Sequence, residues 1–442
     1  MRLACLASAL LAACTASAEE VRPPANELFF PTGAAIAPDE SFLFVANANS
    51  ELRYDSGSIS VLDTTRIDQV VADWVTSGVI PGEADCAQDI DFTETLVCDE
   101  SSFISDQAGV RIGNFATDVA VQDRDNGALR LIIPTRGDPS IAWVDWTGSE
   151  LTCNASGGSY ALCDDAHRLS FISTAPDLAV PEEPFGVFAD SAGQFAMVTH
   201  LTTGAITLID SPKDGPALVT DVASGVFLPD QNTGLRGATG VAGRTPQSPE
   251  DIVYVGSRSD NRIQTFTVGR PPNGAGPYML QGEFFFLDAA GGNSGESRDT
   301  RGMAFSPTGD RLYLVNRRPP TLQIYDTSTG ATGHPLNIPT AVVDMCRQAS
   351  TVAVADAGDG ERAYVTCFQD GQIYIVDPRG SAQTEDILLV GRGPYSVVAA
   401  PNFRKKLYVT NFLEDTISVI DIDPNSSRRH RVVLRIGKPR AL

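Results

Sequence analysis

The fold is decided by the stretch Leu407-Tyr-Val-Thr-Asn-Phe-Leu-Glu-Asp-Thr-Ile-Ser-Val-Ile-Asp421. Its two ends are rich in Val, Ile, Tyr and Thr, which suit a pleated and buried surface. The polar residues Asn411 to Asp415 separate them. The stretch therefore predicts two short strands, Leu407 to Thr410 and Thr416 to Ile420, joined by a polar turn.

This pair of strands recurs along the chain at a constant spacing. Asn411, just after the first strand, and Asp421, which closes the second, lie ten residues apart. The same interval joins five further pairs, the last with Thr in place of Asp: Thr135 and Asp145, His200 and Asp210, Asn316 and Asp326, Cys367 and Asp377, Ser257 and Thr267. A first copy, Asn47 to Asp63, has six extra residues in its turn. The chain thus carries seven copies, and we call the first residue of each pair the landmark.

A third strand is predicted upstream of each pair. Short apolar runs begin at Pro31-Thr-Gly33, Pro184-Phe-Gly186 and Arg301-Gly302, and each of these glycines lies fourteen residues before its landmark. Turn residues such as Pro307-Thr-Gly-Asp310 follow the run. Each copy has room for a fourth strand, and four-stranded units at a period of about 45 residues are typical of propellers. We therefore predict an all-β fold, a seven-bladed β-propeller of four-stranded antiparallel blades.

Two segments of this stretch support a family resemblance. Leu407-Tyr-Val-Thr-Asn411 and Ser418-Val-Ile-Asp421 closely resemble the YVTN-type repeat of seven-bladed propellers. Copies such as Tyr364-Val-Thr-Cys367 match more loosely. The resemblance implies a single propeller over residues 29–442 but no single activity. Proteins with this repeat are often envelope or secreted proteins, and similar propellers serve as lactonases, dehydrogenase subunits or binding scaffolds.

The charge balance excludes one class of partner. The formal net charge of the chain is −22. Because phosphate backbones are bound by basic surfaces, we expect no nucleic-acid partner.

The N-terminus predicts export. Arg2 is followed by an apolar run that ends at Ala13, so residues 1–13 have the character of a signal peptide. Leu11-Ala-Ala-Cys14 resembles a bacterial lipoprotein box, which implies a lipid on Cys14, a tether over residues 14–28 and no other contact with the membrane. Thr15 after Cys14 implies an outer-membrane lipoprotein that faces the periplasm or the cell surface. Cleavage after Ala16-Ser-Ala18, which would release a secreted protein, is the alternative.

Six cysteines remain when the leader is set aside. An even number in an exported protein favours disulfides, and we predict the pairs that are nearest in sequence: Cys86–Cys98, Cys153–Cys163 and Cys346–Cys367. The last pair also follows from topology, because antiparallel neighbours bring the start of one strand and the end of the next to the same face. Metal ligation is the alternative, but there is no Cys-x-x-Cys and the histidines are not clustered.

No catalytic, cofactor-binding or metal-binding site is predicted. The four histidines share no motif, and no nucleophile, phosphate-loop or haem pattern is present. His200 stands at a landmark, where a hydrogen bond in a turn is the expected role. We therefore favour an envelope binding or scaffolding protein, without catalytic activity, that uses the loop face of the propeller. The alternative is a lactonase-like hydrolase in which acidic residues at the channel mouth hold a metal ion.

The candidate binding loop is the turn that breaks the constant spacing in the first copy. Its extra residues include Arg53, Tyr54 and Asp55. Tyr and Arg are enriched at interface hot spots, so we expect this loop to contact an envelope protein or a surface ligand. A turn that packs across the channel mouth and closes the ring is the alternative.

Overall fold

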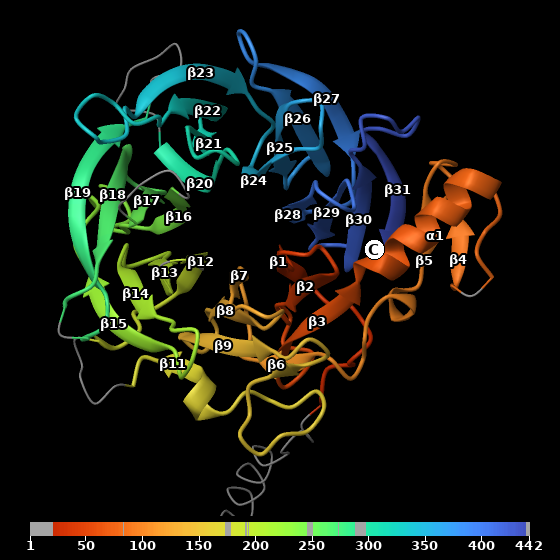
Figure 1. Ribbon diagram of the computed structural model, residues 1–442, viewed down its shortest axis with the longest axis horizontal. Helices are drawn as coiled ribbons and strands as arrows, with labels where there is room; N and C mark the ends of the chain where they lie inside the picture. Colours follow the sequence, from red (N-terminus) through yellow and green to blue (C-terminus); the bar gives the residue numbers. More distant parts are fainter. Residues whose placement is uncertain are drawn as a thin grey trace, which may run out of the picture.

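The computed structural model describes residues 21–438, apart from residues 83, 173–177, 191, 193, 245–250, 273 and 288–297. Its sheets form seven blades around a central axis, and the strands of each blade run outward from the axis in chain order (Figure 1). This confirms the predicted all-β, seven-bladed propeller. Cys14 and the predicted signal peptide lie outside the described residues.

The strands of the blades have the following bounds. Blade 1 contains β1 (Pro31–Ile36), β2 (Phe42–Asn47), β3 (Gly57–Asp63) and β6 (Val110–Ile112). Blade 2 contains β7 (Ala120–Asp123), β8 (Leu129–Thr135), β9 (Ser140–Trp146), β10 (Leu151–Thr152) and β11 (Arg168–Ser170). Blade 3 contains β12 (Pro184–Asp190), β13 (Phe195–His200), β14 (Ile206–Asp210) and β15 (Leu218–Ala223). Blade 4 contains β16 (Ala238–Arg244), β17 (Asp251–Ser257), β18 (Arg262–Gly269) and β19 (Tyr278–Phe286).

The remaining blades continue in the same order. Blade 5 contains β20 (Arg298–Phe305), β21 (Arg311–Arg318), β22 (Pro320–Asp326) and β23 (Ile338–Asp344). Blade 6 contains β24 (Ala349–Asp356), β25 (Glu361–Cys367), β26 (Gln372–Asp377) and β27 (Gln383–Leu389). Blade 7 contains β28 (Pro394–Ala400), β29 (Lys406–Asn411), β30 (Thr416–Asp421) and β31 (Arg431–Ile436), with β5 (Leu96–Cys98) and β4 (Cys86–Gln88) added at its outer edge. Each landmark lies at or near the end of the second strand of its blade.

The core is divided among the interfaces between neighbouring blades. Each of the seven interfaces holds one cluster of buried apolar side chains. In β8, Leu131 and Ile133 pack against blade 1, whereas Ile132 between them packs against blade 3. Because both faces of each sheet are covered, apolar residues occupy both alternations of the central strands, which explains the near-continuous apolar runs.

The longest insertion, residues 64–109, joins the first blade to the last, and we call it the clasp. It begins with α1 (Thr64–Ser77), which is capped by the carboxylate of Asp63 at its start and by left-handed Gly78 at its end. Later in the clasp, β5 pairs in parallel with β31, so that Leu96 lies opposite Leu434 and Cys98 opposite Ile436. The short 3₁₀ helix η2 (Glu100–Ser102) follows. The clasp therefore links the two ends of the ring with backbone hydrogen bonds.

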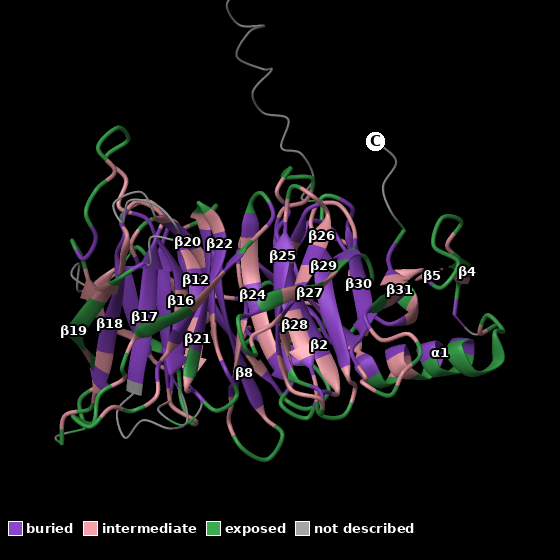
Figure 2. Cartoon of the chain, turned by 90° about the horizontal axis from the view of Figure 1, so that it is seen from above, coloured by how far each residue is buried: buried purple, intermediate pink, exposed green. Residues whose placement is uncertain are grey.

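Helix α1 was not predicted from the sequence, although its apolar face is regular. Ile67, Val70, Val71 and Trp74 follow the spacing of one helical face and are buried. They pack in one cluster with residues of blade 7, including Tyr408 and Leu434. The clasp starts at Asp63, the end of β3 that pairs with Phe42, so it leaves from the face opposite the β2–β3 loop. The start of the clasp therefore lies at the end of the ring away from the candidate binding loop, and Figure 2 shows α1 at one side of the ring.

The second large insertion lies within blade 2. Strands β10 and β11 both pair with β9, one with each part of it, so the insertion divides the outer strand of this blade. The short 3₁₀ helix η3 (Asp165–His167) precedes β11. The insertion therefore lies between the two parts of the outer strand.

The three predicted disulfides are confirmed. Cys86–Cys98, Cys153–Cys163 and Cys346–Cys367 are bonded, with Cα–Cα distances of 4.0, 4.8 and 5.8 Å. Such bonds persist in oxidising compartments, which indicates an exported protein. In the described part of the chain, no helix combines the length and the apolar character needed to cross a membrane.

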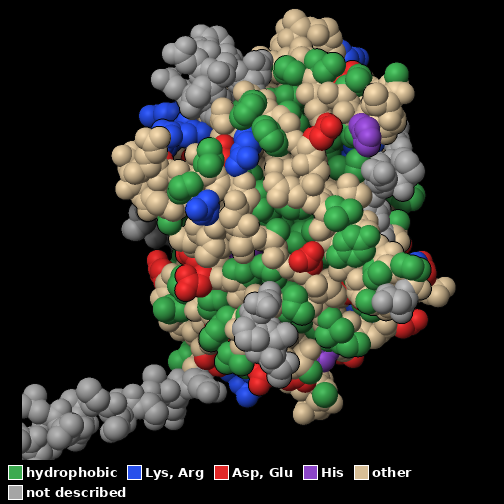
Figure 3. All heavy atoms as spheres, turned by 90° about the vertical axis from the view of Figure 1, so that its left-hand side faces the viewer, with side chains coloured by type: hydrophobic (Ala, Val, Ile, Leu, Met, Phe, Trp, Pro, Cys, Tyr) green, Lys and Arg blue, Asp and Glu red, His purple; other side chains and the backbone are tan. Residues whose placement is uncertain are grey.

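The outer strands of the blades are more exposed than the inner ones. On blade 4, Leu280, Phe284 and Phe286 of β19 are exposed at the rim of the ring. Figure 3 views the ring from this side and shows hydrophobic side chains scattered among polar ones. A hollow in which charged groups converge lies elsewhere, on the axis.

Candidate functional site

The candidate site is built on irregularities that occur in the innermost strand of every blade. In six blades the first strand carries one extra residue near its start, which shifts the pairing with the second strand. In blade 2 the bridge between Ala116 and Thr135 and the later pairing of Ala120 with Ile132 leave the same extra residue. Such bulges turn side chains away from the regular alternation. Here they direct residues toward the axis and toward the next blade.

A closed circle of hydrogen bonds joins the bulges around the axis. At each interface a side chain of one blade donates to a backbone oxygen of the next. The donors and acceptors are Thr32 to Ala116, Thr117 to Phe185, Thr199 to Thr239, Thr239 to Thr300, Arg317 to Ala349, Thr351 to Tyr395 and Thr410 to Thr32. The side chains around the axis are therefore held by a rigid frame, which reduces the entropy lost when a ligand binds.

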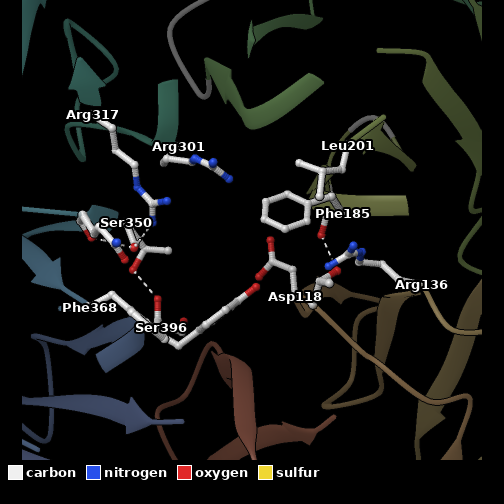
Figure 4. A pocket seen from close by; sticks show the side chains of 13 residues that line it. Asp118, Arg136, Phe185, Leu201, Arg301, Arg317, Ser350, Phe368 and Ser396 are labelled. Atoms are coloured by element: carbon white, nitrogen blue, oxygen red, sulfur yellow. Dashed lines mark hydrogen bonds between the residues drawn. The ribbon is translucent and has the colours of Figure 1, made fainter. Parts of the chain in front are cut away.

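A cavity of about 330 Å³ opens on the axis at the face where the second strands end. Its walls come from the bulges and from the residues that directly follow the landmarks. The lining residues are Thr117, Asp118, Arg136, Phe185, Leu201, Arg301, Arg317, Gln348, Ser350, Thr351, Phe368, Tyr395 and Ser396. Figure 4 shows Arg301 and Arg317 on one side of the cavity and Asp118 on the other, close to Phe185 and Leu201.

Arg317 supplies uncompensated positive charge. Its Nε donates to Ala349 O at 2.8 Å and its Nη2 to Ser350 Oγ at 2.7 Å. Both partners are neutral, and among the described residues no carboxylate lies within ion-pair distance of it. Burial and, after it, the neighbouring charge of Arg301 lower the pKa of Arg317 to about 10, while the charge of Asp299 acts in the opposite direction. A half-buried guanidinium in this state is stabilised by an anion that enters the cavity.

The other two arginines of the cavity have acidic neighbours. Arg301 Nε lies 2.7 Å from Asp299 Oδ1, although the two atoms are not aligned for a hydrogen bond. Arg136 Nη2 lies 2.5 Å from Glu183 Oε1. Burial acts to raise the pKa of Glu183, but hydrogen bonds from Thr202 and Arg136 outweigh it, so this pKa is lowered. Arg301 and Arg136 are thus partly neutralised, and the positive charge is concentrated at Arg317.

Asp118 is the carboxylate that lines the cavity. Its two oxygens accept hydrogen bonds from the backbone N–H groups of Val119 at 2.9 Å and Val187 at 3.1 Å. Burial raises its pKa to about 7, and these two hydrogen bonds reduce the effect. Asp118 therefore changes its charge near neutral pH, as a general acid or base must.

Asp118 occupies a position where most blades have glycine. The second residue of the bulge is Gly33 in blade 1, and a Cβ there would lie 2.5 Å from the Cα of Asp118 itself. At Gly186 of blade 3, a Cβ would lie 2.5 Å from Thr239 O. A side chain at either of these two positions would therefore clash with the next blade. Blades 2, 6 and 7 carry Asp118, Thr351 and Ser396 at this position, and blade 2 is the one among them that presents a carboxylate.

Aromatic rings connect the cavity to the predicted binding loop. The ring of Phe412 lies 6.0 Å from that of Tyr395 and 6.3 Å from that of Phe368, between centroids. Phe30 packs on Phe412 at 5.5 Å, and the guanidinium of Arg53 lies 5.1 Å from the Phe30 ring. A row of aromatic side chains therefore runs from the cavity wall to Arg53.

The three residues of that loop have different environments. Arg53 is exposed and pairs with Glu51. Tyr54 packs edge-on against Phe29, with ring centroids 5.0 Å apart, and Asp55 forms an ion pair with Arg111 at 3.1 Å. Tyr54 and Asp55 fix the loop, whereas the guanidinium of Arg53 is exposed at the surface, where it pairs with Glu51.

His200 does not reach the cavity. It is fully buried behind its landmark position, where its ring nitrogens contact Glu182 O at 3.1 Å and Thr207 Oγ1 at 2.8 Å. Burial lowers its pKa to about 4, so this imidazole is neutral at physiological pH. The hydrogen-bonding role expected from the sequence is found. No three His, Cys, Asp or Glu side chains of the described residues come together as a set of metal ligands.

Sequence reasoning did not identify the residues of the cavity. The repeats do contain a pattern that could have indicated them. When the seven copies are aligned, the position directly after the landmark is arginine in several copies, among them Arg136 after Thr135 and Arg317 after Asn316. Arg301 also appeared in a repeat signature, but only as the neighbour of Gly302. Charged residues at aligned positions of a ring converge on its axis, so this column predicts a cationic centre.

Comparisons with known proteins define the fold. No protein-family model and no curated protein sequence matches the chain. Among solved structures, *Kuenenia stuttgartiensis* hydrazine synthase is similar with 14% identity and a TM-score of 0.56, over 93% of this chain and 99% of that one. A putative 6-phosphogluconolactonase from *Bacteroides fragilis* has 12% identity and a TM-score of 0.53, over 93% and 97% of the two chains.

A further similar structure is the periplasmic gluconolactonase of *Pseudomonas aeruginosa*. It has 14% identity and a TM-score of 0.51, over 82% of this chain and 86% of that one. At these identities the similarity establishes a shared propeller architecture and not a shared activity.

Proposed function

We propose that this protein is an exported binding protein that recognises a small organic anion in the axial cavity. The observation that carries the proposal is Arg317, a half-buried guanidinium with two neutral acceptors and no described carboxylate partner. Arg301 adds positive charge on the same side. Phe185 and Leu201 offer an apolar surface to the body of the ligand. A carboxylate or another oxyanion on an apolar or partly apolar frame matches these walls.

The site is suited to binding with modest size selectivity. A cavity of about 330 Å³ lies at the lower end of the range for small-molecule sites. Hydrogen bonds to a charged group contribute about 1.5–3 kcal/mol each. Loss of the Arg317 contact should therefore weaken binding by about 10- to 100-fold.

The test is calorimetric titration with benzoate and gluconate, two carboxylates that differ in the polarity of their frame. We expect the Arg317→Ala variant to lose affinity and the Arg317→Lys variant, which keeps charge without the planar fork, to lose less. Arg379→Ala is the matched control, because Arg379 is exposed and pairs with Asp377 at the end of β26, on the opposite face. Equal binding by wild type and Arg317→Ala would contradict the proposal.

The cell envelope is the proposed location. A lipid on Cys14 would tether the propeller through residues 14–28, and the resemblance to YVTN-type repeats is consistent with an envelope protein. Arg53 would then contact an envelope protein or a surface ligand at the rim. Replacing Cys14 by Ser should abolish palmitate labelling and release the protein from the membrane fraction. If both stay unchanged, cleavage after Ala18 is the better explanation.

Hydrolysis of a lactone is a second candidate, favoured by Asp118. A carboxylate with a pKa of about 7 can take a proton from water while the oxygen of that water adds to a lactone carbonyl. Arg317 and Arg301 would stabilise the oxyanion, and the ring oxygen would take the proton as the C–O bond breaks. The similar structures include a gluconolactonase and a putative 6-phosphogluconolactonase. Hydrolysis of gluconolactone that is lost in Asp118→Gly would support it, whereas binding without turnover would leave the first proposal.

A further inference from the structure

We propose that an anionic ligand enters the axial cavity together with a proton, and that Asp118 carries this proton. The inference rests on the proposed function and concerns the regulation of the same site. It begins from a simple conflict: the surface that attracts an anion through Arg317 also contains a carboxylate. When Asp118 is ionised, it repels the anion, and when it is protonated, its hydroxyl can donate a hydrogen bond to it.

The charge of an ionised Asp118 is not offset by a neighbouring cation in the described part of the chain. Its oxygens accept only backbone N–H groups, those of Val119 and Val187, and no described Lys, Arg or His side chain lies within ion-pair distance of it. The cavity is small, so a bound anion is close to Asp118 wherever it lies. Charges in a confined, partly desolvated space interact more strongly than in water.

The charged and titratable groups around Asp118 come from five other elements. Arg136 follows β8 and is held by Glu183, which precedes β12. Tyr395 belongs to β28, and Asp118 and the three arginines of the cavity act on its pKa. Arg301 and Arg317 lie on β20 and β21 across the cavity. Strand β1, which touches Asp118 through Gly33, brings no charged group to it.

The pKa values of Tyr395, Arg317 and Glu183 lie away from the window in which Asp118 titrates. Burial raises the pKa of Tyr395 to about 12 and lowers that of Arg317 to about 10. The pKa of Glu183 is lowered, and its charge is therefore constant above its ordinary range. Only Asp118, with a pKa of about 7, changes charge near neutrality among these residues.

The direction of the effect follows from linkage. A bound anion raises the pKa of Asp118, so by reciprocity protonation of Asp118 tightens the binding of the anion. If only the protonated form binds, the apparent dissociation constant rises as that form is depleted, by about tenfold between about pH 6 and about pH 8. Binding at the upper pH should take up close to one proton per ligand.

The test is calorimetric titration of the full chain with benzoate, whose charge is constant over this range, in buffers of different ionisation enthalpy. Wild type should bind about tenfold more weakly at about pH 8 than at about pH 6. Two variants should lose this dependence. Asp118→Gly adopts the residue that four other blades carry at the same position, and Asp118→Asn keeps the size of the side chain. Asp370→Asn, which removes the half-buried partner of the exposed Arg347, is the control and should behave as wild type.

The outcomes separate the two proposals. Binding that is independent of pH in wild type, or equally dependent on pH in both Asp118 variants, overturns the proton-coupled inference and leaves the anion site standing. Failure of wild type to bind benzoate and gluconate at either pH rejects the anion site and the inference with it. Four other blades have glycine at the position of Asp118, so we expect Asp118→Gly to fold. If Asp118→Asn alone fails to fold, the test can still be made with Asp118→Gly.

Discussion

The clasp and the axial cavity both depart from the repeat, but they do so by different means. The clasp inserts residues 64–109, buries apolar side chains such as Trp74 and Leu96, and adds strands to blade 7. The cavity inserts nothing and instead places Asp118, Arg301 and Arg317 at positions that every blade possesses. Buried apolar area stabilises a fold, whereas charges without full compensation do not. Stability and recognition should therefore be separable by substitution.

The largest expected effect is a loss of stability from Trp74→Ala. Trp74 is buried between α1 and blade 7, and its Nε1 donates to Glu94 O at 3.4 Å. Removal of a buried Trp side chain costs about 3–5 kcal/mol. Thermal unfolding should show a clearly lower melting temperature, with anion affinity at low temperature unchanged. Ile90→Ala is the control, since Ile90 is 94% exposed in the turn between β4 and β5 of the same clasp. Equal melting of the two variants would mean that the clasp does not stabilise the ring.

Removal of the disulfide in the clasp is expected to have the next largest effect. Cys86 and Cys98 join β4 to β5 and are separated by 12 residues. In the chain-entropy model a loop of this size contributes about 3 kcal/mol. The double replacement by Ser should lower the stability measured by denaturant unfolding. The same replacement of Cys153 and Cys163 is the comparison, because that pair lies in blade 2, away from the closure of the ring. Unchanged stability in the clasp variant would contradict the role assigned to it.

A cavity substitution should affect the pH dependence of stability. The pKa of Asp118 is raised from 3.8 to about 7 in the folded protein, so the folded state holds this proton more tightly than the unfolded chain. Wild-type stability should therefore fall as pH rises from about 4 to about 7, by about 3 kcal/mol. Asp118→Asn should lack this component, whatever its stability at one pH. Parallel pH profiles of the two proteins in chemical unfolding would refute the assignment.

The smallest effect is expected from Arg53→Ala. The side chain of Arg53 is exposed, so its removal should change the free energy of unfolding by no more than about 0.5 kcal/mol. Because it adds positive charge near the mouth, the association rate of an anion should decrease modestly, most clearly at low salt. Tyr54→Ala is the contrasting variant. It removes the contact with Phe29 and should lower stability instead. If wild type and Arg53→Ala bind the anion at the same association rate at all salt concentrations, Arg53 takes no part in recognition, which then depends on the cavity alone.

The fold was predictable because every blade must bury both faces of its sheet. Each sheet is covered on both faces, so each copy needs the same apolar pattern around its landmark, as Val409 and Ile417 illustrate. The disulfides were predictable because each pair lies within one insertion or one repeat. The clasp was not. Strand β5 has three residues, too few to carry a pattern, and its partner β31 lies at the other end of the chain.

The candidate site was predictable only in part. Arg136 and Arg317 share a column of the repeat, and that column could have been read as lining the axis. Asp118 gave no such signal, because it follows a variable insertion and replaces a glycine. Its charge state depends on burial, which is a property of the assembled ring. The loop with Arg53 was identified by its broken spacing, but its link to the cavity through Phe30 and Phe412 required the structure.

The central claim, that the axial cavity is an anion site organised by Arg317, is tested most directly by a crystal structure of the protein grown with benzoate. The account predicts a carboxylate within hydrogen-bonding distance of the Arg317 guanidinium, with the ring of benzoate against Phe185 and Leu201. Benzoate bound only outside the cavity, or a carboxylate that contacts neither Arg317 nor Arg301, would contradict it.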